Sequence, residues 1–261
     1  MQLNHKQYSG EGAPLLILHG LFGSLSNWNW HARKWSEAFS VYALDLRNHG
    51  NSPHADSMSY PEMARDVLDF MDHHDIDTCH LLGHSMGGKV AMQLAMDHPG
   101  RIRTLVVADI APVPYEGEHD RIFAGLAAID PAAVKTRQEA DAVLVEYEDD
   151  EQVRQFLLSN LQRRKGSKGG FEWRINLPAL EACYADLRAG LEEGSYDGPV
   201  LFLRGDDSNY IQESYREAIL SRFPRAELKT LKQAGHWLHA EKPETFNRLV
   251  TAFIRDNEDE R

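Results

Sequence analysis

The six residues from Gly83 to Gly88 read GHSMGG, with an apolar run before them and a helical pattern after them. A nucleophile at the end of a strand has to turn sharply into a helix, in a strained conformation that exposes its hydroxyl. Side chains two positions before and after it would collide, which accounts for the glycines. The N-terminus of the following helix favours developing negative charge. We therefore expect Ser85 to be the nucleophile of an acyl-transfer reaction.

A serine hydroxyl is a weak nucleophile at neutral pH and needs a base. We expect His236 to supply it, because it lies between the alternating run 227–231 and a helical pattern over 243–254. Folds with this elbow deliver the base in a loop after the last strand, in the chain order serine, acid, histidine. His239 is expected to be structural.

The oxyanion of a tetrahedral intermediate needs hydrogen-bond donors. The first apolar strand ends in the sequence HGLFG, from His19 to Gly23. A backbone N–H of this loop can meet the N–H of Met86 over one carbonyl oxygen. Leu21 is the expected loop donor, and Phe22 is the alternative.

Asp45, His49 and His54 could bind a cation if other ligands joined them. However, the chain has no H-E-x-x-H or paired-cysteine motif, so a structural turn over 45–52 is the better interpretation. We expect no metal and no organic cofactor. GHSMGG also differs from G-x-G-x-x-G, which disfavours a dinucleotide-binding fold.

Short apolar runs that end in turn residues alternate with helical patterns. Runs this short indicate buried strands of a parallel sheet, and their alternation with helices predicts an α/β fold with a mostly parallel, doubly wound sheet. The expected strands are 15–18, 41–44, 79–82, 105–108 and 200–203, with helices at 60–73 and 88–97 between them.

The alternation stops between residues 112 and 197. Sheet elements lie on both sides of this stretch, which favours an insertion over an independent domain. We expect a core of residues 1–111 and 198–261 and a helical cap of residues 112–197. The helical stretches expected in it are 120–129, 137–147, 151–161 and 178–191, and Phe123, Leu126 and Trp173 are candidates for lining an acyl pocket.

Several segments together resemble small bacterial carboxylesterases of the YbfF type, within the α/β-hydrolase superfamily. The resemblance implies a cofactor-free hydrolase that acts on short- to medium-chain acyl esters, or on acyl thioesters, beneath a helical cap. The segments are HGLFGS from His19, DLRNHGNS from Asp45, GHSMGGK from Gly83, DIAPV from Asp109, FEWRINL from Phe171 and GHWLHAEKP from Gly235.

The acid that orients the histidine has two possible sources. Asp109 ends the strand after the nucleophile helix, whereas Asp206 and Asp207 follow the strand after the insertion. The common superfamily pattern has an aspartate three residues after a glycine, and that position here is Ser208. The YbfF-type resemblance places the acid at the earlier strand, so Asp109 is preferred and Asp206 or Asp207 is the alternative.

These residues predict a serine carboxylesterase that forms an acyl-enzyme intermediate. An acyl-thioesterase with the same triad is the first alternative, and a non-catalytic ligand receptor with this fold is the second. Ser85 at the elbow argues against dehalogenases and epoxide hydrolases, which use a carboxylate there.

Composition narrows the class of partner. The 261 residues carry a net charge of −12, which argues against a nucleic-acid binder. The N-terminus is polar and no uncharged apolar run reaches ~18 residues. Two cysteines, Cys79 and Cys183, are too few for a disulfide scaffold. We expect a cytoplasmic protein whose partner is a small acyl ester and not a membrane; the sequence leaves the oligomeric state open.

Overall fold

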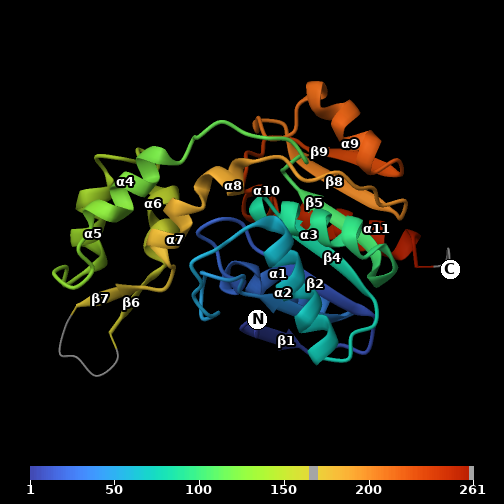
Figure 1. Cartoon of the computed structure of the whole chain (residues 1–261), viewed down its shortest axis with the longest axis horizontal. Helices are drawn as coiled ribbons and strands as arrows, with labels where there is room; N and C mark the ends of the chain where they lie inside the picture. Colours follow the sequence, from blue (N-terminus) through green and yellow to red (C-terminus); the bar gives the residue numbers. More distant parts are fainter. Residues whose placement is uncertain (165–169, 259–261) are drawn as a thin grey trace.

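The computed structural model describes residues 1–164 and 170–258, and its centre is a seven-stranded sheet (Figure 1). The strands lie in the order β1-β3-β2-β4-β5-β8-β9. Neighbouring strands are parallel except at the edge, where β1 pairs antiparallel with β3. The strands are β1 His5–Tyr8, β2 Pro14–Leu18, β3 Ser40–Leu44, β4 Cys79–His84, β5 Ile102–Ala108, β8 Val200–Gly205 and β9 Ala226–Leu231.

Apolar side chains cover both faces of this sheet. In β2, Leu16 and Leu18 belong to one buried cluster, and Leu15 and Ile17 belong to the other. This alternation is the period of two that a strand imposes, and both faces being apolar explains why the parallel strands read as continuous apolar runs. The expected fold class is confirmed.

Helices flank the sheet in two layers (Figure 1). The helices α1 and α11 contact each other and supply one buried cluster, and α2, α3 and α9 supply residues to the other. The core helices are α1 Asn29–Trp35, α2 Tyr60–His73, α3 Met86–Asp97, α9 Arg216–Arg222, α10 Leu238–Glu241 and α11 Pro243–Asp256, with short 3-10 turns at η1 Leu25–Trp28, η2 Pro99–Arg101 and η3 Glu213–Tyr215.

The segment between β5 and β8 leaves the sheet and extends to one side of it (Figure 1). Its apolar residues join the same cluster as those of α2 and α3. Whether it acts as a separate cap stays a prediction. Its elements are α4 Asp120–Ala128, α5 Arg137–Leu144, α6 Glu151–Leu158, β6 Leu161–Arg163, β7 Phe171–Trp173, α7 Leu177–Ala182 and α8 Tyr184–Arg188.

This segment differs from the expected all-helical insertion. The strands β6 and β7 pair antiparallel, but each has three residues, too few to produce a period-two pattern. The single helix expected over 178–191 is two helices, α7 and α8, separated at Cys183.

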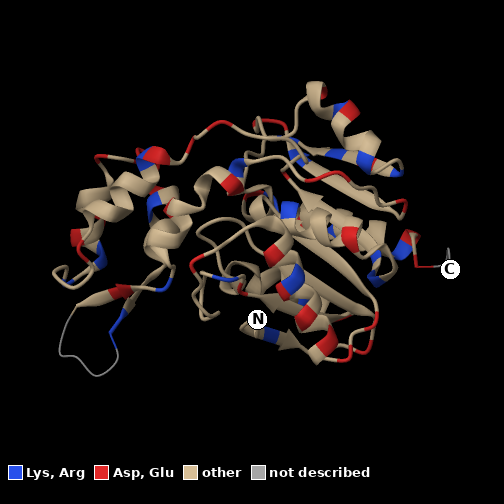
Figure 2. Ribbon diagram, viewed as in Figure 1, with Lys and Arg blue, Asp and Glu red and all other residues tan. Residues whose placement is uncertain are grey.

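Charged residues are interspersed along the core and the inserted segment. Figure 2 shows Lys and Arg alternating with Asp and Glu on the helices of both parts. No helix in the described ranges combines the length and the apolar character that a membrane span requires.

Candidate active site

Ser85 stands at the sharp turn between β4 and α3. Its backbone has φ 52° and ψ −122°, a left-handed conformation that is strained for a residue with a side chain. A Cβ at Gly83 would lie 2.1 Å from the carbonyl oxygen of Gly87, and a Cβ at Gly87 would lie 2.5 Å from that of His19. Both glycines are therefore required by the close approach of backbone, as the sequence pattern predicts.

His236 lies in the loop between β9 and α10 and contacts both Ser85 and Asp109. Its Nε2 is 3.0 Å from Ser85 Oγ, and its Nδ1 is 2.8 Å from Asp109 Oδ2. Since a carboxylate only accepts, Nδ1 carries the proton and Nε2 is left to accept from the serine hydroxyl. The histidine side chain is 18% exposed, Ser85 is partly exposed and Asp109 is fully buried.

The Asp109 carboxylate, at the end of β5, accepts three hydrogen bonds. Its backbone has a positive φ of 55°. Its Oδ1 accepts from the backbone N–H of Gly205 at 3.1 Å, and its Oδ2 accepts from the Ser208 hydroxyl as well as from His236. Since a buried carboxylate is costly without partners, these donors are what keep it in place.

The alternative acids lie elsewhere. Asp206 and Asp207 are exposed, and their backbone N–H groups bond to the carbonyls of Leu231 and Ala234. The Asp206 carboxylate accepts from Ala234 N–H at 3.3 Å. The structure therefore brings Ser85, His236 and Asp109 together, and directs Asp206 and Asp207 to the strand ends beside them.

The loop after β2 lies against the serine. A Cβ at Gly20 would be 3.2 Å from Ser85 Cβ. The Phe22 N–H donates to His49 Nε2 at 3.1 Å, which removes it as an oxyanion donor. The Leu21 N–H has no acceptor among the described residues, and the Met86 N–H belongs to the first turn of α3, where helix geometry leaves donors unpaired.

Comparison with known proteins places the chain in a family. Residues 13–243 match the family described as alpha/beta hydrolase fold. This chain belongs to the α/β-hydrolase fold family. It is 39% identical to esterase YbfF of Escherichia coli K12, over 98% of this chain and all of that protein. It is also 39% identical to mouse sn-1-specific diacylglycerol lipase ABHD11, over 92% of this chain and 80% of the lipase.

A solved structure extends the match to three dimensions. A marine microorganism esterase, 40% identical to this chain, superposes with a TM-score of 0.94, covering 97% of this chain and 99% of the esterase. Together these relatives establish that this hydrolase is a carboxylic ester hydrolase.

Two further residues of the hydrolase, Tyr210 and His84, support His236. The Tyr210 ring stacks on the imidazole with centroids 4.0 Å apart. His84, inside the GHSMGG motif, donates from Nε2 to the His236 carbonyl at 2.8 Å. Burial, with the neighbouring His239 and His236, holds the pKa of His84 well below its ordinary value, so it acts as a neutral donor. Neither role has a local sequence signal.

The turn over 45–52 is structural, as expected. Asp45 is fully buried, and its carboxylate accepts from Asn4 Nδ2 and from the backbone N–H groups of Leu25 and Asn51 at 2.7 to 2.8 Å. Gly50 has φ +57°, and a Cβ there would lie 2.1 Å from Asp45 Cγ. Among the described residues, no cluster of three potential ligands fits a metal ion.

His49 braces the loop after β2. Its Nδ1 donates to the Arg47 carbonyl at 3.0 Å while its Nε2 accepts from Phe22. Its ring lies 5.0 Å from that of His19, whose Nε2 accepts from Leu46 N–H. Burial lowers the pKa of His49 to about 3, which keeps the imidazole neutral and able to accept.

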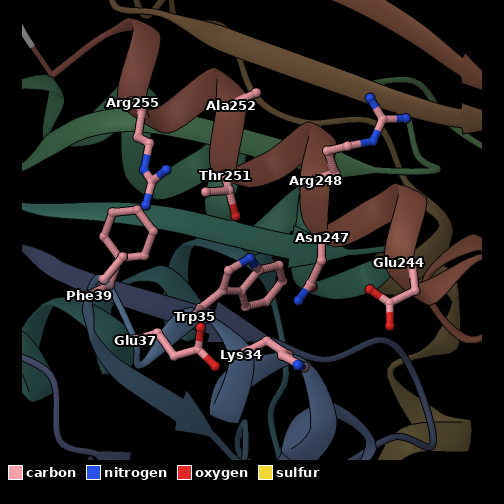
Figure 3. Close-up of a pocket in the computed structure, with 11 residues that line it drawn as sticks. Lys34, Trp35, Glu37, Phe39, Glu244, Asn247, Arg248, Thr251, Ala252 and Arg255 are labelled. Atoms are coloured by element: carbon pink, nitrogen blue, oxygen red, sulfur yellow. The ribbon is translucent and has the colours of Figure 1, made fainter.

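A groove on the α1–α11 face of this hydrolase is separate from the site. It has a volume of about 540 Å³. Residues of α1, of the turn after α1 and of α11 line it, including Trp35, Phe39 and Arg255 (Figure 3). Ser85, Asp109 and His236 are not among its lining residues.

Proposed function

We propose that this hydrolase is a serine carboxylesterase with Ser85 as nucleophile, His236 as general base and Asp109 as the residue that orients His236. The observation that carries the proposal is the unbroken chain of contacts from Ser85 Oγ to His236 Nε2 and from His236 Nδ1 to Asp109, at 3.0 and 2.8 Å. Such a chain lets the imidazole take the hydroxyl proton while the carboxylate stabilises the resulting imidazolium.

The reaction then proceeds in two halves. Ser85 Oγ attacks the ester carbonyl as its proton moves to His236 Nε2, and the backbone N–H groups of Leu21 and Met86 donate to the oxyanion. His236 returns the proton to the leaving alcohol as the C–O bond breaks, which leaves an acyl-Ser85 ester. Water, deprotonated by His236, attacks this ester, and His236 then returns the proton to Ser85 Oγ as the acyl C–O bond breaks, which releases the carboxylic acid and the free serine.

We further propose that residues 112–197 form a cap over this site. Contacts between this segment and the oxyanion loop support the proposal. Asn160 Nδ2 donates to the Phe22 carbonyl at 2.8 Å, and the rings of Phe123 and His119 lie 5.2 and 6.1 Å from the Phe22 ring. These contacts place the inserted segment beside the loop after β2, and we propose an acyl chain of short to medium length for the substrate.

The three apolar cap residues proposed from the sequence differ in their surroundings. Phe123 faces Phe22. Leu126 is fully buried and serves the packing of the segment, and Trp173 is half-buried on β7. Phe123 is also buried, with 3% exposed, and we assign it to the acyl pocket because its ring contacts that of Phe22.

Hydrolysis of p-nitrophenyl esters from acetyl to palmitoyl tests the proposal. We expect turnover that is highest for the shorter chains, and a loss of about 10⁴-fold or more in Ser85→Ala. Ser221→Ala is the matched control, because Ser221 is exposed on α9 and bonds only within its helix. Faster turnover of the matching thioesters would indicate a thioesterase, and a folded protein that turns over neither class would indicate a receptor.

A further inference from the structure

Lys89 lies on α3 one helical turn after Ser85, and its side chain is almost completely buried, with 1% exposed. Its Nζ donates to the carbonyl of Val113 at 2.8 Å and to the carbonyl of Ala189. Val113 lies where the chain leaves the sheet for the inserted segment, and Ala189 lies where it returns. One ammonium group therefore joins the nucleophile helix to both ends of the insertion.

The two ends are also joined to each other at this point. Tyr115 N–H donates to the Arg188 carbonyl at 2.8 Å, and Leu191 N–H donates to the Pro112 carbonyl at 3.4 Å. On the side of α2, the Tyr60 hydroxyl donates to the Leu187 carbonyl. The two connections between the sheet and the inserted segment, residues 112–115 and 187–191, are thus bonded to each other. We call them the crossing segments, and Lys89 Nζ bonds to both of them.

Contacts continue from Lys89 to the catalytic histidine. Its Nζ lies 4.8 Å from the centroid of the Tyr115 ring, within the range of a cation–π interaction. The Tyr115 hydroxyl accepts from Ala111 N–H at 2.8 Å and donates to the Tyr210 carbonyl at 2.6 Å. The Tyr210 ring in turn stacks on His236.

Packing alone does not account for a lysine at this position. Burial disfavours the charged form of Lys89 and lowers its pKa to about 7. Methionine would fill a similar volume without the cost of burying a charge. Buried charges are retained where they satisfy specific partners. The partners here are two backbone carbonyls and two tyrosine rings.

We propose that Lys89 is a positioning residue for the esterase reaction: its Nζ clamps both crossing segments to the nucleophile helix and, through Tyr115 and Tyr210, the residue holds His236 in line with Ser85. This inference rests on the proposed triad. It predicts a loss in kcat more than a change in KM, because misalignment of the base affects the chemical step and leaves the binding of the ester in place.

The test compares Lys89→Met, Lys89→Arg and Tyr115→Phe, with kcat expressed per active site titrated by a phosphonate. Gln93→Met is the matched control, because Gln93 is buried on the next turn of α3 and pairs with Asp97 of the same helix. We expect Lys89→Met to lower kcat about tenfold, as for loss of a charge-assisted hydrogen bond, with KM within about threefold. Lys89→Arg should recover most of the loss, and Gln93→Met should keep the kcat of the parent.

The double variant Lys89→Met/Tyr115→Phe tests the route through Tyr115. If both residues act through Tyr210, the kcat of the double variant should equal that of the less active single variant. If they act independently, the two fold-losses in kcat should multiply. An unchanged kcat in Lys89→Met, or multiplicative losses in the double variant, would overturn the proposal. If Lys89→Met fails to fold, Lys89→Gln takes its place under the same limits. A Ser85→Ala enzyme that stays active would instead reject the triad, and is a separate result.

Discussion

The Ser208 hydroxyl donates a hydrogen bond to Asp109 Oδ2, the same oxygen that accepts from His236. Asp109 directly follows β5, and Ser208 follows the neighbouring strand β8. The acid and a hydroxyl thus come from adjacent strand ends, with the carboxylate on the earlier strand. Ser208 also accepts from Tyr210 N–H at 3.3 Å, so it links the acid to the residue that stacks on the histidine.

Asp109→Asn should lower kcat by several orders of magnitude in a protein that still folds. An asparagine keeps the size but removes the charge, and it can hold the histidine in the wrong tautomer; in a well-studied serine protease this change costs about 10⁴. Asp206→Asn and Asp207→Asn are the matched controls and should stay within about tenfold of the parent enzyme. Near-full activity in Asp109→Asn beside a dead, folded Asp206→Asn or Asp207→Asn would move the acid to the later strand.

Ser208→Ala should lower kcat/KM by about tenfold to hundredfold. A hydrogen bond to a charged group contributes about 1.5–3 kcal/mol, and its loss leaves Asp109 Oδ2 with His236 as its one side-chain donor. Ser208→Thr retains a hydroxyl and should keep most of the activity. Equal activity in Ser208→Ala and the parent would show that the Gly205 and His236 contacts suffice to place the acid.

Gly83→Ala should destabilise the protein, because the new Cβ would lie 2.1 Å from a backbone oxygen that cannot move aside. Overpacking of this kind costs about 1–3 kcal/mol or more. Gly100→Ala is the matched control, since a Cβ there meets nothing within 4 Å. Chemical denaturation of the two variants gives the comparison, and an unfolding free energy for Gly83→Ala equal to that of Gly100→Ala would contradict the geometry of the elbow.

The free energy of unfolding should fall as the pH is lowered below about 6.5. Burial is the first cause that lowers the pKa of seven histidines among the described residues, namely His19, His31, His49, His74, His84, His119 and His239. The folded state keeps them neutral while the unfolded state binds protons, so acidification favours unfolding. For His49 and His239 the loss continues toward pH 3, where the folded state also binds protons.

Urea denaturation at several values between pH 8 and pH 5 measures this dependence. Each proton taken up on unfolding changes the free energy of unfolding by about 1.4 kcal/mol per pH unit. His49→Asn should show a shallower slope than the parent, because it removes one titrating group. An unfolding free energy that is constant or rises toward pH 5 is incompatible with these buried neutral imidazoles.

The sequence was sufficient for those parts of the site that depend on strand ends. The runs before Ser85 and Asp109 form β4 and β5, which pair in parallel. Both residues therefore lie at the carboxyl ends of neighbouring strands. The alternating run 227–231 forms most of β9, and His236 follows it. Local pattern and the rules of parallel sheets are enough to bring these three residues near one another.

Other features depend on contacts between distant segments. The sequence left Leu21 and Phe22 as alternative oxyanion donors. The Phe22 N–H is occupied because it donates to His49, which lies 27 residues away in the chain. In the sequence, Ser208 is notable only because it stands where the common pattern has an aspartate. Its hydrogen bond to Asp109 exists because β8 pairs with β5. The edge strand β1 has a polar sequence in which only Tyr8 is buried, so it gave no apolar signal.

Labelling with an organophosphonate tests the central claim that Ser85 is the covalent nucleophile. The probe phosphonylates a serine only where a base and oxyanion donors activate it. We expect a single mass addition on the peptide that contains Ser85, lost in Ser85→Ala and strongly slowed in His236→Ala. Addition at another serine, or labelling of Ser85→Ala at the rate of the parent enzyme, would contradict the proposed mechanism.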